Sequence, residues 1–244
     1  MKKVILLLFV FSSFMMTSQE GQSFLLNVSE LTIKPGHDEQ FNEGVKRYKS
    51  CYQENNGEET WNIWKRIQGA GNVYVLTSTM ENWAEMDDES EEQADRQCRD
   101  IVREFIWPHI ESSNYSIARS MPEISASPGE NMQLVWVTFF DVENTSDFRE
   151  VVDAVSSAFK DAEGEPRGYW YAYMGGAADA PNYMVSVPFE NFAELDVERD
   201  GPWDVLTKKH GEARAGEMRN KLRNSVDDIW SYLYQLKEDL SMSE

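Results

Sequence analysis

An internal repeat is the feature that most constrains what this chain can fold into. The segment Tyr74–Asp87 aligns without gaps with Tyr183–Asp196, and six of the fourteen aligned positions are identical. The similarity extends outward, because Leu25–Ser29 aligns with Leu134–Thr138 at the same separation of 109 residues. Self-similarity of this kind indicates that one structural unit occurs twice, so we predict a tandem duplication within one chain.

Both copies show the same order of predicted elements: strand, helix, strand, strand, helix, strand. Apolar residues at helical spacing indicate the helices, and short apolar or aromatic runs that end at Gly, Pro or Asn indicate the strands. The predicted elements cover 24–33, 41–52, 61–67, 73–79, 98–105 and 115–120 in the first copy, and 134–142, 147–162, 169–174, 183–187, 212–226 and 230–237 in the second.

This order defines the ferredoxin-like βαββαβ arrangement, whose helices cover one face of the sheet and leave the other bare. Residues 134–140 and 169–174 lack apolar/polar alternation, which is typical of strands buried on both faces. We therefore predict an α+β fold in which two ferredoxin-like repeats, 22–120 and 132–240, pack sheet to sheet as one barrel. The segment 121–131 contains Pro and Gly and is the predicted linker.

Within the repeat, each copy carries the motif Glu-Asn-x-Ala-Glu after its third predicted strand. The side chains of Asn82 and Asn191 are suited to accept hydrogen bonds from free backbone N–H groups at the start of a helix. We interpret the motif as a helix cap, and the alternative is a catalytic role.

The N-terminus has the pattern of an export signal. Lys2 and Lys3 precede the uncharged apolar stretch Val4–Met16, and small and polar residues follow from Thr17. Because spanning a bilayer takes about 20 apolar residues, we predict a signal peptide over residues 1–18 and no membrane span in the mature chain. The protein is then exported, either periplasmic or secreted. The alternatives are a buried N-terminal helix and a retained membrane anchor.

The balance of charge bears on the partners. With 43 acidic and 23 basic residues, the formal net charge is −20. A surface this negative repels nucleic-acid phosphates and anionic lipid headgroups, so nucleic acid is not an expected partner. It does not identify a positively charged partner, since solubility alone explains an acidic surface.

Cysteine and histidine are sparse. Cys51 and Cys98 permit a single pairing, and both a disulfide and two buried thiols stay open as interpretations. His37, His109 and His210 are dispersed and lack the spacing of zinc ligands, so no metal site is predicted.

Ala84 and Ala193, after the third predicted strand of each copy, lie where a Glu/Ser-x-x-Ala pattern recurs in the dimeric α+β barrel superfamily. Over residues 24–237 the chain resembles this superfamily, particularly the proteins like antibiotic-biosynthesis monooxygenases. The resemblance implies a fused dimeric α+β barrel. The superfamily includes cofactor-free oxygenases, haem-degrading enzymes, haem-binding chlorite dismutase-like proteins, isomerases and proteins with no known reaction. Many of them bind the ligand between sheet and helices, often with a His on the helix after the third strand.

The second copy carries about 11 extra residues between Val197 and Gly211. Trp203 and His210 lie there at a spacing that places both on one helix face. A neutral imidazole suits a proton acceptor or a haem ligand, and aromatic strand residues would supply a flat wall. The candidate ligand-binding residues are therefore Trp136, Tyr171, Tyr173, Trp203 and His210, with His210 as the candidate catalytic residue. The alternative makes His210 a surface residue and Trp203 part of the core.

Two functions are consistent with these features. The first is an exported, soluble barrel that binds a small aromatic molecule or has no catalytic activity. The second is a monooxygenase-like oxidoreductase acting on an aromatic or haem-like compound, so whether the protein is an enzyme stays open. No motif specifies a cofactor, and haem is the one that the resemblance suggests. As a pseudo-dimer, the chain is expected to be a monomer or a weak homo-oligomer.

Overall fold

The computed structural model describes residues 21–87, 93–127, 129 and 132–242. The predicted signal peptide, residues 1–18, lies outside the described residues, and so does part of the predicted linker 121–131. Within the described ranges, no helix combines the length and the apolar character that crossing a membrane requires.

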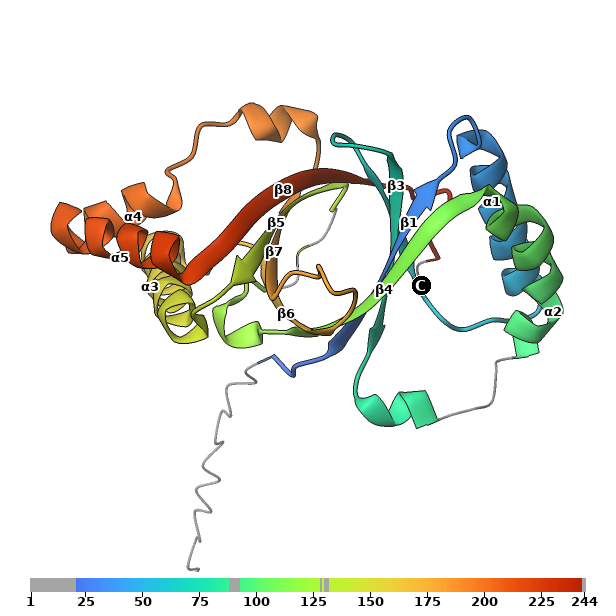
Figure 1. Cartoon of the computed structure of the whole chain (residues 1–244), viewed down its shortest axis with the longest axis horizontal. Helices are drawn as coiled ribbons and strands as arrows, with labels where there is room; N and C mark the ends of the chain where they lie inside the picture. The colour runs from blue at the N-terminus through green and yellow to red at the C-terminus, as the bar shows by residue number, and fades with distance from the viewer. Residues whose placement is uncertain (1–20, 88–92, 128, 130–131, 243–244) are drawn as a thin grey trace, which may run out of the picture.

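Antiparallel strands at the centre of the molecule form one closed barrel (Figure 1). The strands are β1 (Leu25–Ile33), β2 (Asn62–Arg66), β3 (Asn72–Met80), β4 (Ile110–Ser120), β5 (Leu134–Val142), β6 (Tyr169–Gly175), β7 (Tyr183–Phe189) and β8 (Val226–Leu236). Around the barrel they follow the order β1, β3, β2, β8, β5, β7, β6, β4, and β4 pairs with β1 to complete the circle.

The predicted packing of two ferredoxin-like repeats sheet to sheet, as a fused dimeric α+β barrel, is wrong. The strands of 22–120 and of 132–240 do not form two separate sheets that face each other. Instead, β2 pairs with β8 and β4 pairs with β6, so hydrogen bonds run around the whole circumference. Two separate sheets would each leave two edges of unpaired backbone N–H and C=O groups, and closure of the barrel pairs them.

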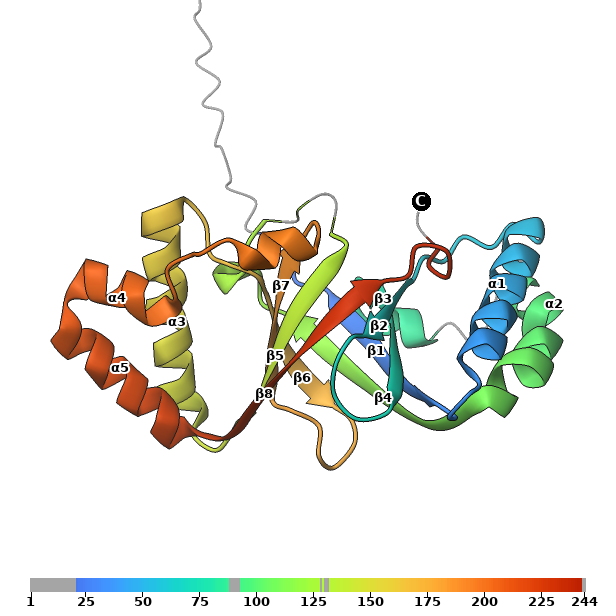
Figure 2. The same ribbon diagram turned by 90° about the horizontal axis from the view of Figure 1, so that it is seen from above.

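Two groups of helices lie on opposite sides of the barrel (Figures 1 and 2). One group consists of α1 (Asp38–Glu54) and α2 (Gln93–Ile101), and the other of α3 (Thr145–Glu163), α4 (Pro202–His210) and α5 (Glu212–Ser225). Short helical turns are η1 (Trp83–Asp87), η2 (Val102–Ile106), η3 (Trp107–His109), η4 (Pro122–Ile124) and η5 (Phe192–Asp196).

Core side chains occupy the spaces between the helices and the barrel wall. On the first side, Phe41 of α1 and Tyr74 of β3 are at most 1% exposed and their ring centroids lie 5.0 Å apart. On the second side, the ring of Phe148 from α3 stacks on Tyr183 of β7 at 4.9 Å and packs edge-on against Trp170. These side chains fill the layer in which the superfamily resemblance implies a ligand.

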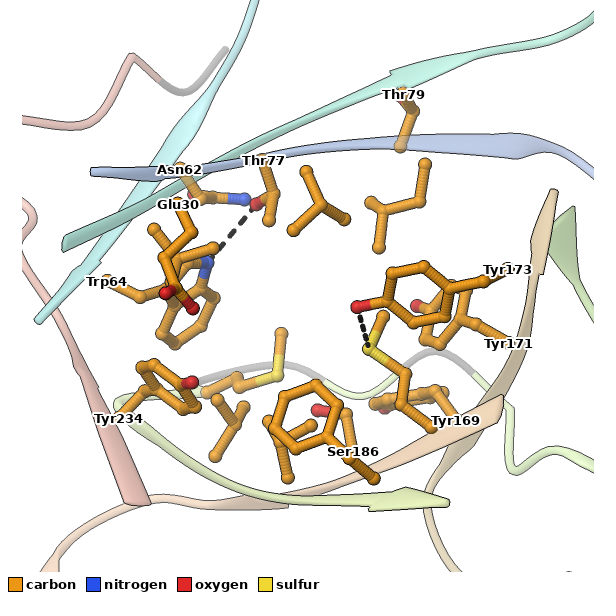
Figure 3. A pocket seen from close by; sticks show the side chains of 18 of the residues that line it. Glu30, Asn62, Trp64, Thr77, Thr79, Tyr169, Tyr171, Tyr173, Ser186 and Tyr234 are labelled. Carbon is orange, nitrogen blue, oxygen red and sulfur yellow. Dashed lines mark hydrogen bonds between the residues drawn. The ribbon is translucent and has the colours of Figure 1, made fainter. Parts of the chain in front are cut away.

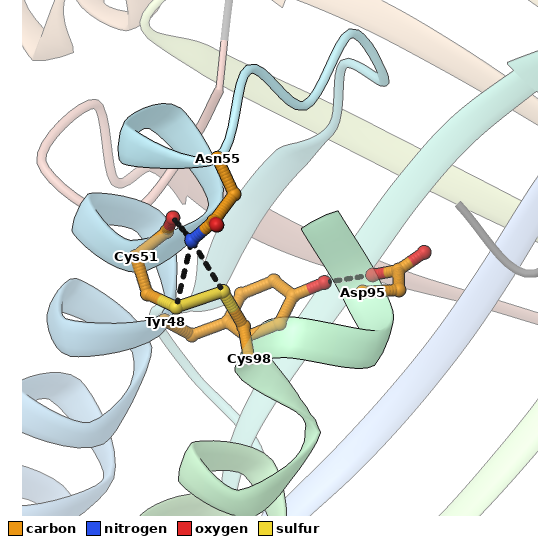
Figure 4. Close-up of a disulfide and its surroundings, with 5 residues drawn as sticks. All are labelled: Tyr48, Cys51, Asn55, Asp95 and Cys98. Carbon is orange, nitrogen blue, oxygen red and sulfur yellow. Dashed lines mark hydrogen bonds between the residues drawn. A yellow bond between two sulfur atoms is a disulfide. The ribbon is translucent and has the colours of Figure 1, made fainter. Parts of the chain in front are cut away.

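A disulfide joins Cys51 of α1 to Cys98 of α2, with a Cα–Cα distance of 5.9 Å (Figure 4). Of the two interpretations of these cysteines, the structure thus shows the bridge. Next to it, the Tyr48 hydroxyl donates a hydrogen bond to the Asp95 carboxylate. The bridge and this hydrogen bond fix the two helices of the first group to each other.

The helix-cap interpretation of the repeated motif is confirmed in both copies. The Asn82 side-chain oxygen accepts a hydrogen bond from the backbone N–H of Ala84 at 2.8 Å, and Asn191 accepts one from Glu194 at 3.2 Å. The side chains of Glu85 and Glu194 accept in turn from the backbone N–H of the first residue of their motif. The motif is therefore used to start η1 and η5.

Candidate binding site inside the barrel

The barrel contains a cavity of about 240 Å³ that is partly open to solvent. Because successive side chains of a strand point to opposite faces, every second residue of each strand faces this space, as Leu26, Val28 and Glu30 do on β1. Seven of the eight strands contribute to its wall. The described residues that line it are Phe24, Leu26, Val28, Glu30, Asn62, Trp64, Val75, Thr77, Thr79, Met132, Val135, Val137, Phe139, Tyr169, Tyr171, Tyr173, Met184, Ser186 and Tyr234.

Large aromatic side chains dominate two opposite parts of the wall (Figure 3). Trp64 and Tyr234 lie on one side of the cavity, and Tyr171 and Tyr173 lie on the other. Trp64 is 7% exposed and Tyr234 is 4% exposed, so both are held by the surrounding core. Aromatic walls with a few polar atoms are typical of pockets that bind small molecules.

Some of the polar groups in the wall are paired with each other and some are not. Trp64 Nε1 donates a hydrogen bond to Thr77 Oγ1 at 3.2 Å, and the Tyr173 hydroxyl lies 3.5 Å from Met184 Sδ (Figure 3). The hydroxyls of Tyr171 and Tyr234 have no hydrogen-bond partner within the part of the chain that the structure describes. These two hydroxyls are available to a ligand.

Burial controls the ionisation of the cavity tyrosines. It raises the pKa of Tyr171 to about 12. The pKa values of Tyr173 and Tyr234 are also raised, first by burial and then by the negative charge of Glu30. All three phenols therefore stay un-ionised at neutral pH and can donate or accept a hydrogen bond.

Glu30 is the one charged side chain among the described residues that line the cavity. It is half-buried, and its carboxylate makes no ion pair or hydrogen bond with another side chain in the described ranges. Figure 3 shows it on the same side as Trp64 and Tyr234. The wall thus combines a single acidic group with aromatic faces.

A second hollow of about 460 Å³ adjoins one end of the cavity. The two share Phe24, Met132, Tyr169 and Tyr171 in their walls. The Tyr169 hydroxyl accepts a hydrogen bond from the backbone N–H of Gly129 at 2.8 Å. This end of the barrel therefore lies next to the segment that joins the two halves of the chain.

The structure brings together two of the five residues predicted to bind a ligand. Tyr171 and Tyr173 line the cavity. Trp136 points away from it on β5 and is 40% exposed, because its neighbours Val135 and Val137 face inward. Trp203 packs among α3, α4 and α5, with the Arg219 guanidinium 5.5 Å from its ring. His210 is exposed at the end of α4.

Among the wall residues that sequence reasoning missed are Glu30, Trp64 and Tyr234. The sequence did contain a signal for Glu30. Every second residue of a strand points to the same face, so Leu26, Val28 and Glu30 share one face of their strand. That signal is weak here, because strands covered by helices outside and by a core inside are apolar on both faces.

The residues present do not fit haem, the cofactor that the superfamily resemblance suggests. The described wall contains neither His nor Cys. The imidazole of His210 lies on the exposed end of α4, outside the barrel.

Comparison with known proteins gives similarity of fold only. No family model matches the chain. No curated protein matches its sequence. Among solved structures, an anthrone oxidase-like protein aligns with a TM-score of 0.52 and 9% identity, covering 88% of this chain and 92% of that chain. A monooxygenase-type protein from Fusobacterium nucleatum aligns with a TM-score of 0.50 and 11% identity, covering 87% and 92%.

A haem-binding protein from Thermus thermophilus aligns with a TM-score of 0.48 and 12% identity, covering 89% of this chain and 92% of that chain. The first two similarities agree with the predicted resemblance to monooxygenase-like barrel proteins at the level of the fold. Because one fold hosts many activities, the function has to be argued from the site.

Proposed function

We propose that this protein binds a small, largely apolar aromatic molecule inside its barrel. The observation that carries the proposal is the cavity of about 240 Å³ inside the barrel, with aromatic side chains on opposite sides. Rings that stack or pack edge-on against tyrosine and tryptophan gain attraction beyond burial of apolar area. The hydroxyls of Tyr171 and Tyr234 supply hydrogen bonds that orient such a ligand.

The size of the cavity restricts the ligand further. Pockets for drug-sized molecules hold roughly 300–1,000 Å³; the space between the aromatic walls is smaller, about 240 Å³, and adjoins the second hollow at one end. The part of the ligand held between the aromatic walls is therefore expected to contain one or two rings.

Isothermal titration calorimetry with one-ring and two-ring aromatic compounds tests the proposal. The informative variant is Ser186→Phe, because Ser186 faces the cavity from β7 and a phenyl ring there occupies its volume. The control is Trp136→Phe on the outer face of β5. We expect saturable binding to the wild-type protein and the control, and loss of binding in Ser186→Phe. Equal binding by all three proteins would contradict a site inside the barrel.

The second candidate function is a monooxygenase-like oxidoreductase acting on an aromatic compound. It is supported by the fold shared with an anthrone oxidase-like protein and by the Glu30 carboxylate in the cavity, a candidate proton acceptor. The test is oxygen consumption in the presence of each compound that binds. Oxygen consumption that saturates with the compound in the wild-type protein and is lost in Glu30→Gln supports an enzyme. Binding without oxygen consumption supports a binding protein.

We also propose that the protein is exported and works in an oxidising compartment. The support is the signal-like pattern of residues 1–18 together with the Cys51–Cys98 disulfide, since such bridges persist outside the cytoplasm. Mass spectrometry of the protein from the producing cells tests this. A chain in the soluble extracytoplasmic fraction that begins near residue 19 supports export, and an uncleaved cytoplasmic chain contradicts it.

The proposal that the chain arose by duplication is supported by its repeated sequence and by the identical use of Asn82 and Asn191 as caps. It predicts that residues 22–120 and 132–240 of related sequences align with each other better than chance. Related chains that lack any such similarity between halves would count against it.

A further inference from the structure

Glu30 is a half-buried carboxylate to which no described side chain supplies an opposite charge or a hydrogen bond. On the inward face of β1 its neighbours are Leu26 and Val28, and across the cavity the wall is formed by aromatic side chains (Figure 3). Removing a charged group from water costs free energy unless an opposite charge or hydrogen bonds compensate for it. The Glu30 carboxylate is therefore free to pair with a cationic group that enters the cavity.

Two basic side chains, Lys65 and Arg66, follow Trp64 in sequence and have partners outside the wall. The charge of Arg66 nevertheless acts on Tyr234, where it opposes the rise in pKa that burial causes. Lys65 Nζ lies 2.8 Å from Asp38 Oδ1, on the side of β2 that faces α1. The Arg66 guanidinium donates a hydrogen bond to the Ala70 carbonyl and lies 4.5 Å from the ring centroid of Tyr232. The described wall itself contains no Lys, Arg or His, and the cavity tyrosines are neutral, so the wall has a net charge of one unit, negative.

The aromatic faces favour the same sign of charge in a ligand. The rings of Trp, Tyr and Phe attract cations within about 6 Å of their centroids, and Trp does so best. Trp64 and Tyr234 lie on the same side of the cavity as Glu30, and Tyr173 lies across from them. A cation held there would meet a carboxylate and ring faces together, whereas an anion would be repelled.

A bare metal ion fits this wall poorly. Hard cations such as Ca²⁺ take six to eight oxygen ligands, and most described wall residues are apolar or aromatic. No group of three or more His, Cys, Asp or Glu residues with metal-binding geometry occurs among the residues that the structure describes. A cation with an apolar body suits the cavity better.

We infer that the ligand of the barrel is a small organic cation, an amine or ammonium compound with one aromatic ring, whose charged group pairs with Glu30. This inference rests on the proposed binding function and specifies its ligand class. Glu30 provides the counter-charge, Trp64 and Tyr234 provide cation–π contacts, and the remaining apolar wall holds the ring.

The test compares three ligands of similar size at pH 7 by calorimetry: 2-phenylethylammonium, 2-phenylethanol and phenylacetate. They differ mainly in the charge of the end group. The informative variant is Glu30→Gln, which keeps shape and removes the charge. The control is Glu111→Gln, which makes the same change of charge at an exposed position of β4. Ser186→Phe reports whether any binding occurs inside the barrel.

We expect the ammonium compound to bind the wild-type protein about tenfold more tightly than the alcohol, which corresponds to a cation–π and charge contribution of about 1.4 kcal/mol. Phenylacetate should bind most weakly. Glu30→Gln should lower the affinity for the ammonium compound to that for the alcohol, and Glu111→Gln should leave the preference intact.

Two outcomes would overturn the inference. If the alcohol binds as tightly as the ammonium compound and Ser186→Phe abolishes both, the cavity binds small aromatic molecules without selecting cations, and the proposed function survives alone. The inference also fails, and the proposed function survives, if Glu30→Gln still binds the ammonium compound more tightly than the alcohol. If none of the three ligands binds, the proposed function fails together with this inference.

Discussion

At the scale of single residues, position in the barrel decides the chemistry of the tyrosines. Tyr171, Tyr173 and Tyr234 face an apolar interior, where the ionised form of a phenol loses its hydration. Their pKa values are raised for this reason, and Glu30 adds to the effect at Tyr173 and Tyr234. The cavity therefore keeps its hydrogen-bonding hydroxyls over a wide range of pH.

This leads to a prediction about alkaline titration. A buried phenol has a higher pKa in the folded protein than its ordinary value of about 10 in the unfolded chain. Its contribution to stability is complete below pH 10 and is lost as the pH rises through its pKa in the folded protein. We expect the free energy of unfolding to fall above pH 10, with Tyr171 ionising at about 12. In Glu30→Gln, the phenolate absorbance of Tyr173 and Tyr234 should develop at lower pH than in Glu111→Gln. Identical absorbance titrations of the two variants would contradict the placement of Glu30.

A pair of histidines outside the barrel gives a prediction about acid. The Nδ1 atoms of His37 and His109 lie 2.8 Å apart, so one ring donates and the other accepts. The pKa of His109 is lowered by burial, by His37 and by Lys34. His109 therefore binds a proton more readily in the unfolded chain than in the folded protein. Its contribution to stability is complete above about pH 6.5 and is lost as the pH falls through the pKa of His109 in the folded protein.

We therefore expect the urea midpoint of the wild-type protein to fall from pH 7.5 to pH 5 by more than that of His109→Gln. The carboxylates titrate in both proteins, so their effect on the midpoint cancels in this comparison. An equal change of midpoint in the two proteins would show that the histidine pair does not contribute.

At the scale of elements, the disulfide is the strongest link between α1 and α2. Cys51 and Cys98 are separated by 47 residues, and the bridge restricts the unfolded chain over that length. In the chain-entropy model a loop of this size corresponds to about 4 kcal/mol. The helices of this group carry no residue of the described cavity wall.

Replacing both cysteines, Cys51→Ser and Cys98→Ser, should lower the free energy of unfolding by about 2–4 kcal/mol. Chemical denaturation with urea measures this, and the wild-type protein under reducing conditions is the matched control. Ligand binding to the folded double variant should be unchanged, because the bridge lies outside the barrel. A loss of binding in the folded variant would contradict this separation of stability and site.

The elements themselves were largely predictable from the sequence. The range 134–142 coincides with β5, and the predicted helix 147–162 lies within α3 (Thr145–Glu163). Agreement is poorer at 98–105, where α2 gives way to the π-helical turn η2 before Pro108. Local spacing of apolar residues determines where helices and strands form, but the end of a helix depends on tertiary packing as well.

At the scale of the whole molecule, the sequence predicted a barrel of two sheets packed face to face, and not the strand pairs that close the observed barrel. The pairs β2–β8 and β4–β6 join strands that are far apart in the chain, and no local pattern of residues marks which edges will meet. The cavity has the same origin: aromatic strands predicted Tyr171 and Tyr173, but not that Glu30 and Trp64 lie opposite them. Which face of a strand is the inner one follows only from the closed barrel.

The most direct test of the central claim is a crystal structure of the protein with 2-phenylethylammonium bound. The account predicts electron density for the ligand inside the barrel, with its ring beside Trp64 or Tyr234 and its ammonium group within hydrogen-bonding distance of Glu30. Density in the helical layer near Trp203 and His210, or on the outer surface with an empty barrel, would contradict it.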